Sequence, residues 1–240
     1  MKKIEDNKNQ LVFRAKIDET LANSVRRYIN QIPILAIDEV EISKNDSALY
    51  DETLAHRIGL IPIKREKISD KKSTKLVLHV KKEGLVYSGD LKGQLSVVYK
   101  NIPITMLSEN KELELTAFVR FGKGIEHAKF SPGLMFYRNV TEIPIDKDFY
   151  DKIKEELPPS VEIKEDGKKL VIIDNGKIEI SDVCEGIFEK KKKKIEIQKK
   201  DELVITIESF GQMDPAEIFI ESIEVLKKDL SDFRKNINKI

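Results

Sequence analysis

The sequence has few of the residues that cross-link a protein or anchor it in a membrane. Its 240 residues include no tryptophan and one cysteine, Cys184, which excludes an internal disulfide and a multi-thiolate cluster. No apolar run approaches the roughly 20 residues of a membrane-spanning helix, and the first residues lack the apolar segment of a secretory signal. We therefore expect a soluble, cytoplasmic protein.

An excess of charge of either sign is also missing. Lysine and arginine total 43 and aspartate and glutamate 42, which leaves a formal net charge of +1. Binding of nucleic acid by bulk electrostatics needs a surplus of cations, so little direct contact with nucleic acid is expected. The lysine run at residues 190–194 leaves a local contact open, although we favour a solvated loop or a protected strand edge.

The sequence contains none of the motifs G-x-S-x-G, H-E-x-x-H and C-x-x-C. Glu52 and His56 are four residues apart on an expected helix, but two ligands do not make a zinc site. Residues 122–127 resemble a phosphate-binding loop only superficially, because His127 stands where the final glycine is required. We predict no catalytic, metal-binding or cofactor-binding residue. The alternative is a small-molecule enzyme that uses His56 or His127.

Hydrophobic patterning indicates a mixture of strands and helices. A first helix follows residue 18, and Pro33 stops it. A second helix begins near residues 47–51, with Leu54 and Ile58 on one face and Gly59 as a plausible end. Strands are expected at residues 9–17, 34–42, 76–80, 85–87, 94–99, 113–121 and 203–208.

The segment between these strands and the last helix has a different pattern. Residues 151–157 are an expected short helix. The pairs Asp166-Gly167 and Asn175-Gly176 each favour a hairpin turn, so a small β-meander is predicted, with its last strand at residues 177–180.

The last helix has the clearest pattern. Asp214 can cap it, Pro215 suits its first position and Glu217 completes a capping-box-like arrangement. A helix of about 26 residues would be roughly 39 Å long. A narrow apolar stripe on such a helix favours packing against another chain, although packing on the chain's own sheet is the alternative. The stripe repeats at intervals of four and three residues: Phe219, Ile223, Leu226, Leu230, Phe233, Ile237 and Ile240.

Several segments, in the same order, carry a resemblance to the alpha-like family that includes the archaeal RNA polymerase polypeptide called D, or Rpo3. This family is related to the bacterial alpha amino-terminal domain and to the eukaryotic third-largest polymerase subunit. The resemblance implies a discontinuous α+β fold. Residues 1–42 plus 202–240 would form a dimerisation domain, residues 43–140 a β-rich assembly domain and residues 141–201 an insertion. The matching segments are residues 23–27, 37–64, 101–104, 122–133 and 208–217.

The resemblance implies a non-catalytic scaffold subunit of DNA-directed RNA polymerase, a nucleotidyltransferase. Its partners would be the alpha-like subunit L, the small subunits N and P and the second-largest subunit, called B, while Mg²⁺ and Zn²⁺ would lie elsewhere in the complex. A free-standing homodimer is the alternative. The implied dimer interface is Leu21, Val25, Tyr28, Phe219, Ile223, Leu226, Leu230, Phe233 and Ile237. The implied docking residues for the large subunit are Asn23, Arg26, Arg27, His56, Arg57, Gly59, Leu60 and Pro62.

The insertion departs from the pattern of the family. Many relatives hold an iron–sulfur cluster there, and such a cluster needs about four thiolates from the protein. This chain offers only Cys184. We therefore expect an insertion without a cluster, in which Cys184 is a small, partly buried residue.

Overall fold

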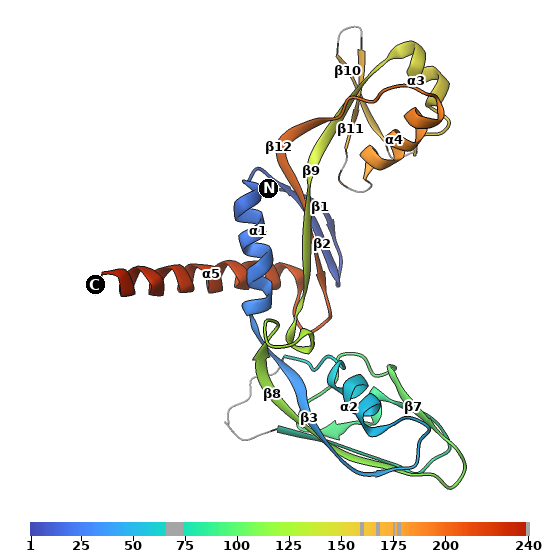
Figure 1. Ribbon diagram of the computed structural model, residues 1–240, viewed down its shortest axis with the longest axis vertical. Helices are drawn as coiled ribbons and strands as arrows, with labels where there is room; N and C mark the ends of the chain where they lie inside the picture. Colours follow the sequence, from blue (N-terminus) through green and yellow to red (C-terminus); the bar gives the residue numbers. More distant parts are fainter. Residues whose placement is uncertain (66–73, 159–160, 167–168, 175, 177–178, 239–240) are drawn as a thin grey trace. The chain divides into compact units, whose positions relative to one another are not determined.

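The structure is a computed structural model that describes residues 1–65, 74–158, 161–166, 169–174, 176 and 179–238 (Figure 1). Backbone contacts divide the chain into two compact units, and each unit is built from two segments. Unit 1 comprises Met1–Asn23 and Met135–Ile207, and unit 2 comprises Ser24–Leu134 and Glu208–Ile240. These units divide the chain at other points than the expected boundaries at residues 42, 140 and 201, and that three-part division stays a prediction.

Unit 1 is built on a six-stranded sheet with the order β1-β2-β12-β9-β11-β10. The tight antiparallel pairing of β10 with β11, in which Asp166 faces Lys169, confirms the hairpin expected there. The expected strand at residues 203–208 is confirmed as part of β12. The strands are β1 (Lys2–Asp6), β2 (Gln10–Ala15), β9 (Gly133–Asp146), β10 (Glu162–Asp166), β11 (Lys169–Ile173) and β12 (Gln198–Ser209).

Two helices of unit 1, α3 (Lys147–Ile153) and α4 (Ile180–Lys190), lie beside β10 and β11 (Figure 1). The rings of Phe149 and Phe188 meet edge to face at 4.8 Å. We call the apolar cluster around them the Cys184 core. Its buried members are Ile143, Ile145, Phe149, Ile153, Leu157, Leu170, Ile172, Ile180, Cys184, Ile187 and Phe188.

The second expected hairpin is wrong where the structure describes it. Ile180 begins α4 and does not end a strand, while residues 175 and 177–178 lie outside the described part of the chain. Ile180, Cys184 and Ile187 recur at helical spacing and are all buried, so apolar packing outweighs the local turn preference of Asn-Gly. The short helix α3 is confirmed in kind, but it begins at Lys147, four residues earlier than expected.

Unit 2 contains a four-stranded sheet of order β3-β8-β4-β6 and a separate pair, β5-β7. Helix α2 lies beside this β-rich region (Figure 1), and Leu54 and Ile58 are fully buried as expected. Helix α1 crosses the boundary between the two units. The remaining elements are α1 (Glu19–Tyr28), β3 (Pro33–Asn45), α2 (Asp51–Gly59), β4 (Thr74–Val80), β5 (Gly84–Tyr87), β6 (Lys92–Gly93), β7 (Pro103–Leu107), β8 (Leu113–Lys123) and α5 (Pro215–Ile237), with short 3₁₀ turns at Ile29–Gln31, Ser88–Asp90 and Ala128–Phe130.

Strand β8 follows the expected alternation only as far as Val119. Phe121, predicted to point inward, is 50% exposed, whereas Gly122 is buried. A Cβ atom at Gly122 would lie 2.7 Å from the ring of Phe130, so the glycine and that ring together fill the place of an inward side chain.

The strand expected at residues 94–99 is wrong. Among the described residues, only β6 and an isolated bridge between Ile63 and Val97 form near it. Leu95 and Val97 are buried nonetheless, so the alternation there reports burial and not strand pairing.

Helix α5 has 23 residues and begins at Pro215 as expected, but the capping-box arrangement is wrong. Asp214 is the N-cap residue and makes no side-chain hydrogen bond to the helix. Within the described residues, no helix is both long enough and apolar enough to cross a membrane.

Candidate interaction surfaces

The C-terminal end of α1 and the middle of α5 line a groove of about 450 Å³ in unit 2. We call it the arginine groove, because Arg26 and Arg27 are both exposed on it. It joins residues from both sets predicted from the sequence, since Tyr28 and Leu226 come from the expected dimer interface. The lining residues are Ser24, Arg26, Arg27, Tyr28, Asn30, Gln31, Ile125 and Leu226.

The electrostatic character of the groove is set by its two arginines. They lie in the last turn of α1, where a positive side chain is stabilised by the negative end of the helix dipole. Burial raises the pKa of Tyr28, and the carboxylate of Asp229 adds to this effect. Among the described residues, Arg27 forms no ion pair with a carboxylate. The groove therefore presents positive charge beside the apolar side chains of Ile125 and Leu226.

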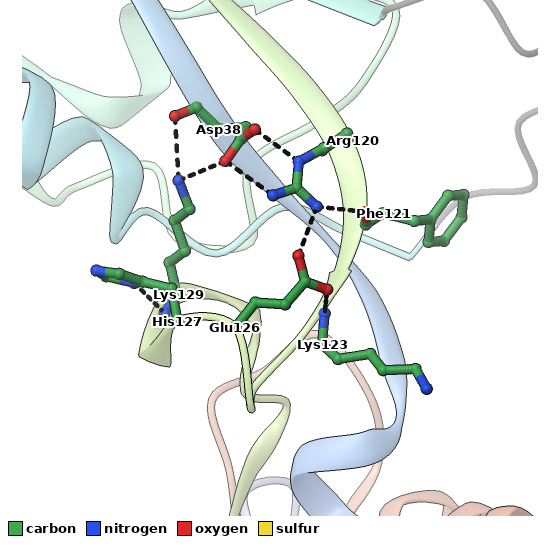
Figure 2. A network of polar contacts seen from close by, with 7 residues as sticks. All are labelled: Asp38, Arg120, Phe121, Lys123, Glu126, His127 and Lys129. Carbon is green, nitrogen blue, oxygen red and sulfur yellow. Dashed lines mark hydrogen bonds and ion pairs between the residues drawn. The ribbon is translucent and has the colours of Figure 1, made fainter.

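Next to the groove, the turn at residues 122–129 is held by a network of charged side chains (Figure 2). The Arg120 Nε donates to Asp38 Oδ2 at 2.6 Å, and one terminal nitrogen donates to Glu126 Oε2 at 3.0 Å. The other carboxylate oxygen of Glu126 accepts the Lys123 N–H at 2.9 Å. Lys129 Nζ lies 2.8 Å from Asp38 Oδ1. We call Asp38, Arg120, Glu126 and Lys129 the Arg120 network.

The network covers a buried aromatic ring and shifts the pKa values of its acids. The Arg120 guanidinium stands 4.6 Å from the centre of the Phe130 ring, which is completely buried. The hydrogen bond from Arg120 is the main cause of the lowered pKa of Asp38. For Glu126, the Lys123 N–H is the main cause of the lowered pKa, followed by Arg120. Both acids are therefore stabilised as carboxylates.

The tip of this turn is attached to the segment that follows α1. The Ile125 N–H donates to the Asn30 carbonyl at 3.1 Å. A Cβ atom at Gly124 would lie 2.6 Å from Asn30 Oδ1, so only glycine permits this close approach. The Ser131 hydroxyl is 3.1 Å from the same Asn30 oxygen. The turn and the arginine-bearing segment therefore hold each other in place.

The second predicted docking group lies on α2 and the loop after it. His56, Arg57 and Leu60 are exposed, and Gly59 and Pro62 are half-buried. One terminal nitrogen of Arg57 donates to the Pro103 carbonyl at 2.6 Å, so this arginine is partly committed within the chain. None of these residues lines the arginine groove. Asn23, also in the predicted set, is half-buried on α1.

The predicted dimer interface divides into an inner part and an outer part. Val25 is buried within the chain at 3% exposure, while Leu21 is 50% exposed. Tyr28, Phe219, Ile223 and Leu226 are half-buried. Farther along α5, Leu230, Phe233 and Ile237 are 59%, 65% and 51% exposed. We call these three residues the outer seam.

One group of potential metal ligands gathers among the described residues: His79, Glu112 and Glu114, with ligand atoms within 4.8 Å of one another. Hydrogen bonds from Lys44 first, and then from Lys81, lower the pKa of Glu112 to about 2. The carboxylate is thus already compensated by two ammonium groups, and we interpret the group as an ion-pair cluster.

The insertion contains the two remaining features that the sequence singled out. Cys184 is fully buried and not partly buried as expected, and burial raises its pKa to about 11. In the lysine run, Lys191 pairs with Glu156 at 2.8 Å and Lys193 with Asp146 at 3.2 Å. Part of the run is therefore compensated by the chain's own carboxylates.

Ile125, Asn30 and the Arg120 network are the site residues that sequence reasoning missed. An isoleucine between the glycines and His127 of a polar turn was a visible signal for Ile125. Asp38 and Arg120 are 82 positions apart, and no local pattern indicates their pairing.

The sequence matches two known domains. Residues 35–150 match the RNA polymerase Rpb3/RpoA insert domain, and residues 102–230 match the RNA polymerase Rpb3/Rpb11 dimerisation domain. The chain therefore belongs to the alpha-like subunit family of RNA polymerase, which confirms the resemblance and the α+β fold expected from the sequence.

The individual relatives are archaeal subunits named DNA-directed RNA polymerase subunit Rpo3. The one from Thermococcus kodakarensis is 41% identical over 147 residues, which cover 56% of this chain and 57% of the relative. The one from Pyrococcus furiosus is 35% identical over 69% of this chain and 66% of its own length. The one from Pyrobaculum calidifontis is 31% identical over 94% of this chain and 92% of its own length. The chain thus spans little more than half of the first relative and nearly all of the last.

Proposed function

We propose that the chain is a non-catalytic assembly subunit of DNA-directed RNA polymerase. The observation that carries the proposal is the outer seam, three large apolar side chains that are each more than half exposed on one helix. Their heptad spacing suits coverage by a second helix and not by a small ligand. The match to a dimerisation domain over residues 102–230 supports the same interpretation.

The proposed partner for the outer seam is the small alpha-like subunit L. The second-largest subunit would dock on the surface that includes Arg26, Arg27 and residues 56–62, and the small subunits N and P would join the same assembly. The complex would act in the cytoplasm. Its catalytic residues, Mg²⁺ and Zn²⁺ would belong to other subunits.

A charge placed on the outer seam tests the pairing with subunit L. In the L complex, Leu230→Asp would bury a carboxylate without a partner, which costs several kcal/mol, or at least about a hundredfold in affinity. The matched control is Ile220→Asp, because Ile220 lies on the same helix and is also 59% exposed, but is off the heptad stripe. Size-exclusion chromatography of the mixed subunits should show that only Leu230→Asp loses the complex. Equal behaviour of the two variants would contradict the proposed interface.

A homodimer is the second candidate, because another copy of the chain could also cover the outer seam. We expect the chain alone to elute as a 27.6 kDa monomer in light-scattering chromatography. A stable homodimer that Leu230→Asp dissociates would favour a free-standing binding module instead.

We also propose that this chain holds no iron–sulfur cluster. With its pKa raised to about 11, the Cys184 thiol is neutral near pH 7, and one thiol cannot replace about four thiolates. Protein purified without oxygen should be colourless and contain no iron or acid-labile sulfide. Stoichiometric iron in that material would contradict the proposal.

A further inference from the structure

Ile125 is the most exposed apolar side chain on the arginine groove, at 68%. A single exposed isoleucine is ordinary on a protein surface. Two features set this one apart, namely its position at the rim of a groove and the rigidity of the turn that carries it.

The backbone of the turn is fixed before any partner arrives. The Ile125 N–H is bonded to Asn30, and the Glu126 N–H donates to the Lys123 carbonyl at 2.8 Å. The Glu126 side chain bonds both the turn and Arg120. Binding through a preordered residue avoids the entropy cost of ordering a loop, and this favours Ile125 as a contact of high energetic weight.

The groove beside Ile125 also has a defined chemistry. Leu226 supplies a second apolar side chain, Arg26 and Arg27 supply positive charge, and the remaining lining residues are uncharged at neutral pH. Within the described part of the chain, no carboxylate lines the groove. An occupant that complements this surface carries an apolar side chain next to one or more carboxylates, because arginine binds carboxylates through paired hydrogen bonds.

We propose that Ile125 and the arginine groove form one docking site for an acidic segment of the second-largest polymerase subunit, with Ile125 as its apolar anchor. The inference rests on the proposed function and deepens it by joining the turn at residues 122–129 to the arginine surface. The Arg120 network positions the anchor. The helical partner L is assigned to the outer seam, whose exposed residues are apolar, whereas the groove is positively charged.

The test measures binding of the purified second-largest subunit to the preformed pair of this chain with subunit L. Ile125→Ser should weaken binding at least about tenfold, as expected for an interface hot spot, whereas Ile125→Val should stay within about threefold of wild type. The control is Leu85→Ser, because Leu85 is 53% exposed on β5 of the same unit and lies outside the groove. Arg27→Ala should also weaken binding and should reduce its dependence on salt, since an ion pair is lost.

Each alternative outcome contradicts a specific statement. Normal wild-type binding with no effect of Ile125→Ser overturns the anchor, and an equal loss for Leu85→Ser does the same. An unchanged affinity and salt dependence of Arg27→Ala overturns the acidic character of the occupant. Loss of subunit L by Ile125→Ser would assign the groove to the dimer contact. Failure of the wild-type pair to bind the second-largest subunit at all would overturn the proposed function itself.

Discussion

The Cys184 core of unit 1 and the Arg120 network of unit 2 each fix the structure around a turn, but by opposite physical means. The core buries eleven residues, all apolar in character, in the insertion where the family resemblance led us to look for a cluster. The network joins two carboxylates to two cations, and the Arg120 side chain remains 45% exposed. Apolar burial contributes free energy in proportion to the area removed from water, whereas a partly exposed ion pair contributes little.

This difference indicates two separate roles. An insertion without cluster ligands has to be stabilised by packing, so truncating its core should have a large effect on unfolding. The Arg120 network adds little stability but determines where Ile125 is held, so disturbing it should affect partner binding more than unfolding. Four predictions sharpen this comparison.

The largest effect is expected from Phe188→Ala in the Cys184 core. Phe188 is 4% exposed and packs on Phe149, and a buried Phe→Ala change costs about 3–5 kcal/mol. Hydrogen exchange followed by mass spectrometry should show lost protection across residues 141–201. The control is Phe136→Ala in the same unit, since Phe136 is 48% exposed and should cost far less. Similar losses for both variants would mean that the core does not hold the insertion.

A smaller loss is expected from Cys184→Ser. The substitution buries a hydroxyl in an apolar site, which costs about 1–3 kcal/mol when it lacks a hydrogen-bond partner. Cys184→Ala should cost less, because it leaves only a small cavity. Urea unfolding followed by circular dichroism would rank the three proteins. A serine variant as stable as wild type would mean that the site is less apolar than its neighbours indicate.

Replacement of Arg120 should cost less again. Arg120→Ala removes a pair that is partly screened by water, and we expect a loss of about 1 kcal/mol in unfolding free energy. Its effect on binding of the second-largest subunit should be larger, because the turn that carries Ile125 loses its support. Arg120→Lys keeps the charge but not the forked geometry and should restore binding only in part. A large loss of stability with unchanged binding would reverse the roles given to the core and the network.

The sequence predicted those parts of the structure that local patterns determine. Buried Leu54 and Ile58 follow from helical spacing, and the hairpin of β10 with β11 follows from Asp166-Gly167. It failed where distant contacts decide the outcome. Phe121 points outward because Gly122 and Phe130 fill the space beneath it, and Ile180 begins a helix because the Cys184 core favours that face.

The same limit applies to the candidate site. Arg26 and Arg27 could be named from a motif. Ile125 gains its significance only from the bond of its N–H to Asn30, 95 positions earlier in the chain, and from Leu226, which lies a further 101 positions along. No pattern within one segment contains that information.

The smallest effect expected is a pH dependence confined to the ion pairs of unit 2. Hydrogen bonds from Lys44 and then Lys81 lower the pKa of Glu112 from 4.5 to about 2 in the folded chain. A lowered folded pKa contributes stability that is fully present above the unfolded value and is lost as the pH falls through the folded value. The contribution of Glu112 should therefore disappear between pH 4.5 and 2, and that of Asp38, whose pKa is also lowered, below pH 3.8. Urea midpoints of wild type and Glu112→Gln should differ above pH 5 and converge near pH 2. Hydrogen exchange in the Cys184 core, corrected for its intrinsic pH dependence, should change less over this range than exchange in β8. A difference between wild type and Glu112→Gln that persists unchanged to pH 2 would show that the contacts of Glu112 act through packing and not through its charge.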